Sequence, residues 1–239
     1  MEKVEININN VKYNFYTKSS NTSLKKIVLI CNGFTNRKEE KDIMEIINIL
    51  TDNNYGVVFF DIEKKTKFFS RYKEKLVLSN FQEKIKNIYG FIKEKYPDIR
   101  IEVLSSRFGA FVTLTYMKNF EVKFDRVVLN TPAINIKYFL KNKLDKRRLI
   151  NINKINLSKL SRKKQEQITD LYNEIAKNNI YGSNYVFENI VIIHNKNNDS
   201  IDYKSSEHFI KNNCTNSYIL KRNSKEKIIN YILKELMKE

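Results

Sequence analysis

The chain has 239 residues, 41% of them hydrophobic and 12% aromatic, which suits one folded domain with a sizeable core and excludes a disordered chain. The sequence contains no run of about 18 apolar residues, so it predicts no membrane-spanning helix. Lys and Arg outnumber Asp and Glu by 44 to 27, and the net charge of +17 favours a nucleic acid, an anionic membrane surface or an acidic protein as partner. The charge has a competing explanation in codon bias, because Lys, Asn, Ile, Tyr and Phe all have A/T-rich codons.

The N-terminal residues and the cysteines indicate the cellular compartment that we expect for the protein. The first five residues lack the basic start and apolar stretch of a secretory signal, so we expect a cytoplasmic protein. Cys31 and Cys214 lie in apolar, strand-like surroundings, without a second pair that could build a disulfide framework or a metal site. We therefore expect two buried, reduced thiols, no metal and no cofactor.

The hydrophobic pattern predicts an α/β protein with one doubly wound, mostly parallel sheet. It opens with a β-hairpin over 4–8 and 11–16, whose Asn9-Asn10 turn needs positive φ. Short apolar runs then alternate with amphipathic helices, which is typical of right-handed βαβ units. The predicted strands are 26–31, 57–61, 101–105, 126–130, 189–194 and 216–220, and the predicted helices are 40–50, 81–96, 108–117, 203–211 and 224–238.

A tight turn follows the strand at 101–105, in the sequence Ser105-Ser106-Arg107-Phe108-Gly109. It resembles the G-x-S-x-G elbow of α/β-hydrolases, in which small flanking residues let a strained strand-to-helix turn expose the nucleophile. Ser105 and Gly109 are the small residues, and they frame Arg107. The resemblance implies one α/β-hydrolase domain over 1–239 with a helical cap inserted at 134–185. That basic interval has helical spacing, and a solvated helical excursion is the alternative interpretation.

Two further segments narrow the resemblance. Residues 32–38, Asn-Gly-Phe-Thr-Asn-Arg-Lys, follow the third strand, and Asn197-Asn198-Asp199 follow the seventh. With Leu104-Ser105-Ser106, they resemble the acyl-transferases, or acyl-carrier-protein thioesterases, of bacterial luminescence operons. The resemblance to α/β-hydrolases covers nearly the whole chain, whereas the narrower one rests on these short segments. The narrower resemblance implies a serine that attacks a fatty acyl thioester, a histidine base and an orienting aspartate.

The triad that this resemblance implies is incomplete in the sequence. Arg107 occupies the nucleophile position, and Ser106, one residue earlier, should point away from the exposed site because side chains alternate along a strand. The aspartate position matches Asp199 or, after a shift of one residue, Asn198; a turn or capping role explains either equally well. No histidine follows the last strand, at 220–224.

The two histidines of the chain lie elsewhere. His194 ends the seventh strand and His208 lies in the next helix, positions where a packed or surface role is more common than base catalysis. Ser106, Asp199 and His194 are thus the candidate catalytic residues, and a structural role is favoured for Ser106 and His194.

The resemblance also implies an oxyanion hole. Its donors are backbone N–H groups, so they do not depend on the side chains that replace the nucleophile and the base. Phe34 and Phe108 would supply them. With Arg107 alongside, the resemblance implies an anion site, and we hypothesise that the Arg107 guanidinium pairs with Asp199. The candidate ligand-binding residues are Asn32, Gly33, Phe34, Arg107, Phe108 and Asp199.

Three functions compete on this basis. The favoured one is a non-catalytic or impaired α/β-hydrolase-like protein that binds an acyl or other anionic ligand, or an acidic partner such as an acyl carrier protein. The second is an active thioesterase or acyl-transferase with non-standard catalytic residues. The third is binding to nucleic acid or an anionic membrane, which we weigh lower because no Arg-Gly repeat, zinc-finger spacing or aromatic RNA-binding strand accompanies the charge.

Overall fold

A computed structural model describes residues 1–18, 23–32, 37–61, 78–136, 162–180, 185–196, 201–213, 216–220 and 225–238. The strands in this part of the chain are β1 Glu2–Ile8, β2 Val11–Thr17, β3 Ile27–Asn32, β4 Gly56–Asp61, β5 Ile101–Ser106, β6 Arg126–Asn130, β7 Ile190–Asn195 and β8 Asn216–Leu220. The helices are α1 Arg37–Asp52, α2 Leu78–Lys95, α3 Phe108–Phe120, α5 Arg162–Lys177, α6 Tyr203–Asn213 and α7 Lys225–Leu236.

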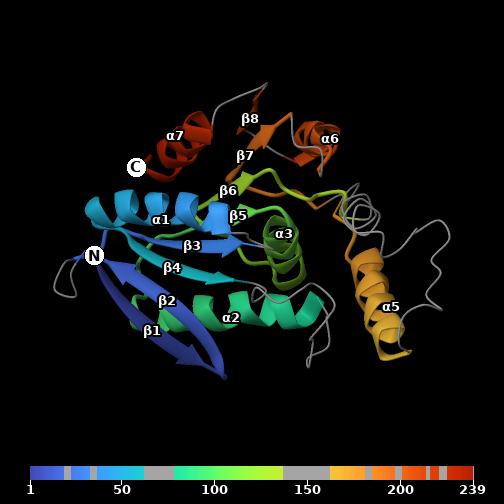
Figure 1. The fold of residues 1–239 in the computed structure, drawn as a ribbon, viewed down its shortest axis with the longest axis horizontal. Helices are drawn as coiled ribbons and strands as arrows, with labels where there is room; N and C mark the ends of the chain where they lie inside the picture. The colour runs from blue at the N-terminus through green and yellow to red at the C-terminus, as the bar shows by residue number, and fades with distance from the viewer. Residues whose placement is uncertain are drawn as a thin grey trace.

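The described strands form one eight-stranded sheet in the order β1-β2-β4-β3-β5-β6-β7-β8 (Figure 1). The strands from β4 to β8 in that order run parallel, while β2 pairs antiparallel with both β1 and β4. The chain moves from β3 to β4 on one side and then returns past β3 to β5 on the other. This reversal creates a switch point between β3 and β5, where open α/β sheets bind ligands outside the carboxyl ends of their strands.

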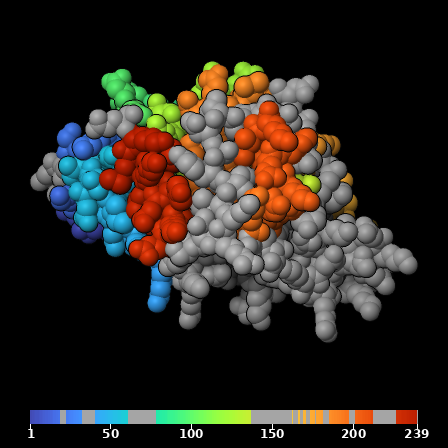
Figure 2. Space-filling view, turned by 90° about the horizontal axis from the view of Figure 1, so that it is seen from above, coloured from blue at the N-terminus to red at the C-terminus, as the bar shows by residue number. Residues whose placement is uncertain are grey.

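Helices cover both faces of the sheet, as the sequence predicted. On one face α1 and α7 pack over Val28, Leu104 and Val128, and the two helices lie side by side in Figure 2. On the opposite face α2 and α3 pack over the alternate residues of the same strands, including Val103 and Leu129. The central strands are therefore buried on both sides, which explains their continuous apolar sequences.

The turn of the opening hairpin confirms its sequence signal. Asn9 and Asn10 have φ of 49° and 62°. Asparagine tolerates this left-handed conformation better than most residues, and two consecutive positive φ values give the turn twist that suits a hairpin.

Helix boundaries differ from the sequence prediction where apolar periodicity carries no information. Helices α1 and α2 each begin three residues earlier than predicted, and the added first turn of α1 is polar. Helix α3 runs to Phe120 and is buried continuously from Phe108 to Met117. Because α3 is enclosed on nearly all sides, it lacks the polar stripe that would mark its length in the sequence.

Helix α5 lies within the interval that the sequence assigns to a cap. Its Glu174 carboxylate accepts a hydrogen bond from the backbone N–H of Leu78, the first residue of α2, and Ile175 is buried in the main core. A negative charge at a helix N-terminus is favourable, and α2 has no acidic residue of its own in its first turn. Residues 137–161 lie outside the described part of the chain, so the extent of the cap remains a prediction.

Long apolar helices do not occur in the part of the chain that the structure describes: none of its helices combines the length and the apolar character that a membrane crossing requires.

Candidate functional site

The turn between β5 and α3 adopts a strained backbone conformation. Arg107, its single linking residue, has φ 54° and ψ −118°. A non-glycine residue in such a region costs about 1–3 kcal/mol and persists only where its surroundings impose it. Here the end of β6 does so: the Arg107 N–H donates to the Asn130 carbonyl at 3.3 Å, and the Arg107 carbonyl accepts from the Ala133 N–H at 3.0 Å. The turn has the strand–turn–helix form that the sequence predicted, with an arginine at its tip.

Small polar groups fill the space beneath this turn. The hydroxyls of Ser105 and Thr113 share a hydrogen bond of 2.7 Å in the interior, which ties β5 to α3. The neighbouring Cys31 thiol is fully buried, and desolvation raises its pKa to about 12, although hydrogen bonds with the two hydroxyls oppose the shift. Cys31 is therefore buried and free, as expected, and a thiol with a raised pKa is a poor nucleophile. Cys214 lies outside the described residues.

A row of polar residues crosses the carboxyl edge of the sheet beside the turn. Asn32 of β3, Ser106 of β5 and Asn130 of β6 are paired in register. Residues aligned in this way share one face, and here it is the face covered by α1 and α7, opposite to the Ser105–Thr113 hydroxyl pair. The position of Ser106 supports the interpretation that it is not the residue exposed by the turn.

Asn32 and Asn130 flank Ser106 and differ in their surroundings. Asn32 is buried, with 3% of its surface exposed, while Asn130 is half-buried and accepts a hydrogen bond from the Thr131 hydroxyl through Oδ1 at 3.2 Å. The Thr131 N–H in turn donates to the Ile193 carbonyl at 2.7 Å. The ends of β5, β6 and β7 are thus joined by backbone hydrogen bonds into one rigid rim.

His194 is a fully buried residue with both ring nitrogens engaged. Nδ1 lies 2.7 Å from the Ser206 hydroxyl and Nε2 lies 3.4 Å from the Ile201 carbonyl oxygen. Burial lowers the pKa of the imidazole to about 4, against the opposing effect of the Ile201 carbonyl and of Asp202 and Glu207. This geometry supports a packing role, in which the neutral ring fastens α6 to β7. The other histidine, His208, lies on the exposed face of α6.

Several of the sequence-derived candidates lie outside the described residues: Gly33, Phe34, Asn198 and Asp199. The Phe34 N–H donor and the Arg107–Asp199 pairing therefore stay predictions. Phe108 begins α3, with its ring buried edge-on against Phe81. Within the described ranges, no group of three metal-ligating side chains comes together.

Two residues at or near the site escaped the sequence analysis. Asn130 joins the polar row, and it could have been found because it ends a buried parallel strand, as Asn32 does. Ser206 lies on α6, the helix that follows β7, and its hydroxyl forms a hydrogen bond with the His194 ring. Nothing in the local sequence indicates this pairing.

The strain at Arg107 makes a stability measurement informative. Glycine adopts the observed backbone angles without a steric penalty and costs about 0.5–1 kcal/mol in chain entropy, so we expect Arg107→Gly to raise the free energy of unfolding by about 1 kcal/mol. Urea titration followed by circular dichroism would measure it, with Arg107→Ala, which keeps the strain, as the control. A loss of stability in the glycine variant alone would contradict a strained turn.

Comparisons with known proteins agree with this architecture at the level of fold. No family model matches the sequence, and a search of curated proteins finds no significant match. Solved structures do match. Est1E from Butyrivibrio proteoclasticus superposes with a TM-score of 0.66 at 13% identity, covering 99% of both chains.

Two other matches have the same character. An esterase from Pyrococcus furiosus has a TM-score of 0.67 at 16% identity, covering 98% of this chain and 90% of its own. A variant of the monoglyceride lipase from Saccharomyces cerevisiae has a TM-score of 0.63 at 16% identity, covering 98% of this chain and 93% of its own. Identities this low establish the fold alone, and the superpositions extend over nearly the entire chain. Together with the sheet order and the turn at Arg107, they show that this chain has the α/β-hydrolase fold.

Proposed function

We propose that this protein is a non-catalytic or strongly impaired member of the α/β-hydrolase superfamily that binds an acyl or other anionic ligand at the carboxyl edge of its sheet. The single observation that carries the proposal is Arg107 at the tip of the turn. The strained backbone that presents a nucleophile in hydrolases is retained here, and an arginine occupies that position.

The site has lost the groups that triad chemistry needs. Arginine cannot attack a carbonyl, and removing the nucleophile or the base from a triad enzyme lowers kcat by about a million-fold. The chain has two histidines. One, His194, is enclosed and hydrogen-bonded through both nitrogens, and burial lowers the pKa of its ring to about 4, which makes it a weak base. A buried ring whose two nitrogens are both engaged supports loss of the catalytic base.

The same geometry suits the recognition of a negative charge. A guanidinium stays protonated, and its planar donors match a carboxylate or phosphate in a paired arrangement. Arg107 also stands directly before α3, and the N-terminus of a helix favours an anion. The neighbouring amides of Asn32 and Asn130 add polar groups at the same edge. An acyl group carried on an acidic protein, such as an acyl carrier protein, is a partner that would complement the net charge of +17.

The second candidate function is an active thioesterase or acyl-transferase that uses Ser106, Asp199 and His194. The likeness to the fold of esterases and a lipase favours it. The two candidates differ in one requirement, because only the enzyme needs a serine that reacts covalently with the acyl group.

Turnover and binding, measured on the same preparation, test the proposal. We expect no hydrolysis of decanoyl-coenzyme A above background and no labelling by a fluorophosphonate probe, but saturable binding of decanoyl-coenzyme A by calorimetry. Arg107→Met should weaken that binding by about 10–100-fold, since a hydrogen bond to a charged group contributes about 1.5–3 kcal/mol.

The control variants separate the alternatives. Arg107→Lys keeps the charge and loses the planar fork, so its affinity should fall between those of the wild type and Arg107→Met. Ser106→Ala should bind like the wild type. Hydrolysis and labelling that both disappear in Ser106→Ala would replace our proposal with the enzymatic one.

A further inference from the structure

A groove lies between the N-terminal hairpin and the end of α2, near the amino ends of the parallel strands. Arg107 lies at their carboxyl ends. The volume of the groove is about 390 Å³, within the range of small-molecule sites. Apolar residues form most of its wall, and the residues that line it are Glu2, Val4, Ile6, Phe15, Thr17, Ser23, Leu24, Lys95, Tyr96 and Ile99. Val4, which is 52% exposed on the edge strand β1, extends the apolar surface to the rim.

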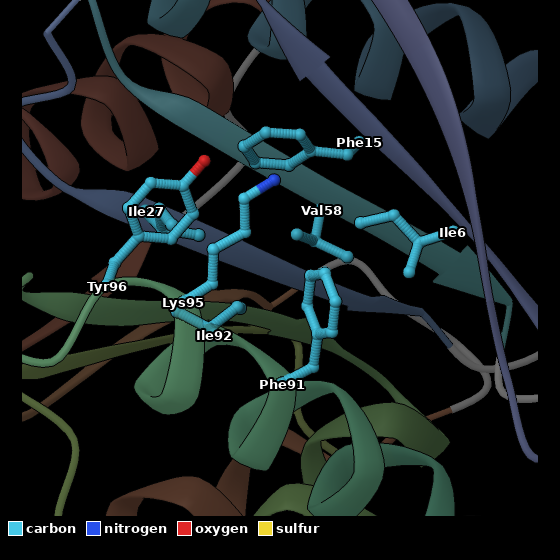
Figure 3. Close-up of a pocket in the computed structure, with 8 residues that line it drawn as sticks. All are labelled: Ile6, Phe15, Ile27, Val58, Phe91, Ile92, Lys95 and Tyr96. Carbon is cyan, nitrogen blue, oxygen red and sulfur yellow. The ribbon is translucent and has the colours of Figure 1, made fainter.

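A smaller cavity continues the groove toward the core. It shares Ile6, Phe15, Lys95 and Tyr96 with the groove, and Ile27, Val58 and the α2 residues Phe91 and Ile92 complete its lining. Figure 3 shows the Lys95 side chain rising between these residues, with its ammonium toward Phe15. The cavity volume is about 10 Å³, so it admits little more than one methyl group or water until the Lys95 stem moves.

Lys95 supplies the positive charge of this groove. Its ammonium lies 5.9 Å from the Phe91 ring centroid and 5.6 Å from that of Tyr96, contacts that hold the charge beside the apolar wall. No carboxylate of the described residues forms an ion pair with it. Glu2 also lines the groove, so a ligand with one anionic group would be placed with that group at Lys95 and away from Glu2.

We propose that this groove binds a single-chain amphiphile with one carboxylate, such as a medium-chain fatty acid. The apolar chain lies against Val4, Ile6 and Phe15, and the carboxylate meets the Lys95 ammonium. The affinity comes mainly from apolar surface removed from water, and the ion pair selects the charged head group. The site is distinct from the Arg107 site, because Ile27 begins β3 and Lys95 ends α2, whereas Arg107 follows the carboxyl end of β5.

Paramagnetic broadening locates the ligand directly. A nitroxide-labelled fatty acid, added to the full-length ¹⁵N-labelled protein, should broaden amide resonances of the hairpin and of residues 91–99. In calorimetry on Arg107→Met, which removes the anion site proposed above and serves as the background for the next substitution, decanoate should bind more tightly than 1-decanol. Lys95→Met should weaken decanoate binding by about fivefold and abolish that preference, because an exposed ion pair contributes up to about 1 kcal/mol.

Two variants complete the test. Val4→Glu places a carboxylate at an exposed position of the groove and should weaken decanoate binding more than Val4→Thr, which exchanges one methyl group for a hydroxyl. Arg107→Met should leave the broadening of the hairpin unchanged. Broadening confined to the turn at Arg107 would overturn the second site while supporting the first. The absence of broadening at the hairpin, or an unchanged preference in Lys95→Met, would also overturn it.

Discussion

Replacing Glu102 with glutamine is expected to lower the free energy of unfolding by about 3–5 kcal/mol, because it leaves a buried ammonium without its counter-ion. Glu102 is fully buried, and its Oε1 lies 2.9 Å from Lys26 Nζ, whose side chain is only 5% exposed. Burial lowers the pKa of Lys26 and raises that of Glu102, and the ion pair opposes both shifts. Without the carboxylate, the desolvation penalty of Lys26 is no longer offset by an ion pair.

The effect should reach the C-terminal helix. Lys26 Nζ also donates to the Lys238 carbonyl at 3.1 Å, and Arg126 Nη1 donates to the Glu235 carbonyl at 2.6 Å. The pair and Arg126 together fasten the end of α7 to the amino ends of β3, β5 and β6. We expect Glu102→Gln to speed hydrogen exchange in α7 more than in α3.

A double variant provides the control. The combined substitution Lys26→Met and Glu102→Leu removes both charges and should recover most of the lost stability, since an apolar pair of similar volume is often as stable as a buried ion pair. Glu5→Gln breaks the exposed pair with Lys12, whose side chains are 51% and 59% exposed, and should cost less than about 1 kcal/mol. Urea unfolding measures all four proteins. A cost below 1 kcal/mol for Glu102→Gln would contradict the role of the pair.

A loss of stability by about 3 kcal/mol between pH 6.5 and pH 4 is the expected signature of His194. The pKa of its imidazole is about 4 in the folded protein, against about 6.5 in an unfolded chain. Between these values the unfolded state binds more protons, so the folded protein is fully stabilised above pH 6.5 and loses stability as the pH falls toward 4. A difference of about 2.5 pKa units corresponds to about 3 kcal/mol.

The matched pair of histidine variants isolates this contribution. His194→Asn retains a polar group near the Ser206 hydroxyl and removes the titration, so its stability should fall less steeply over that pH range. His208→Asn, on the exposed face of α6, should reproduce the wild-type profile. Urea midpoints from pH 4 to pH 7.5 give the comparison. Equal slopes for the wild type and His194→Asn would show that other groups govern the pH dependence.

The buried environment of His194 illustrates the limit of sequence analysis at this site. Its position at the end of β7 was predictable from the apolar run that precedes it, because burial of a strand on both faces leaves a local pattern. Its partner Ser206 lies on α6 and the nearby Ile201 precedes that helix. The direction in which a ring faces depends on how the helix packs on the strand, and no local pattern records it.

By itself the sequence determined the alternation of strands and helices, the Asn9-Asn10 turn and the placement of Arg107 between β5 and α3, because each follows from periodicity or turn chemistry within a few residues. Only the tertiary structure decided the strand order around β3 and the alignment of Asn32, Ser106 and Asn130 in one row. It also decided the pairing of Lys26 with Glu102, 76 residues apart. These features depend on register and packing between distant segments, which are set by the burial of the whole sheet between its helices rather than by any one stretch of chain.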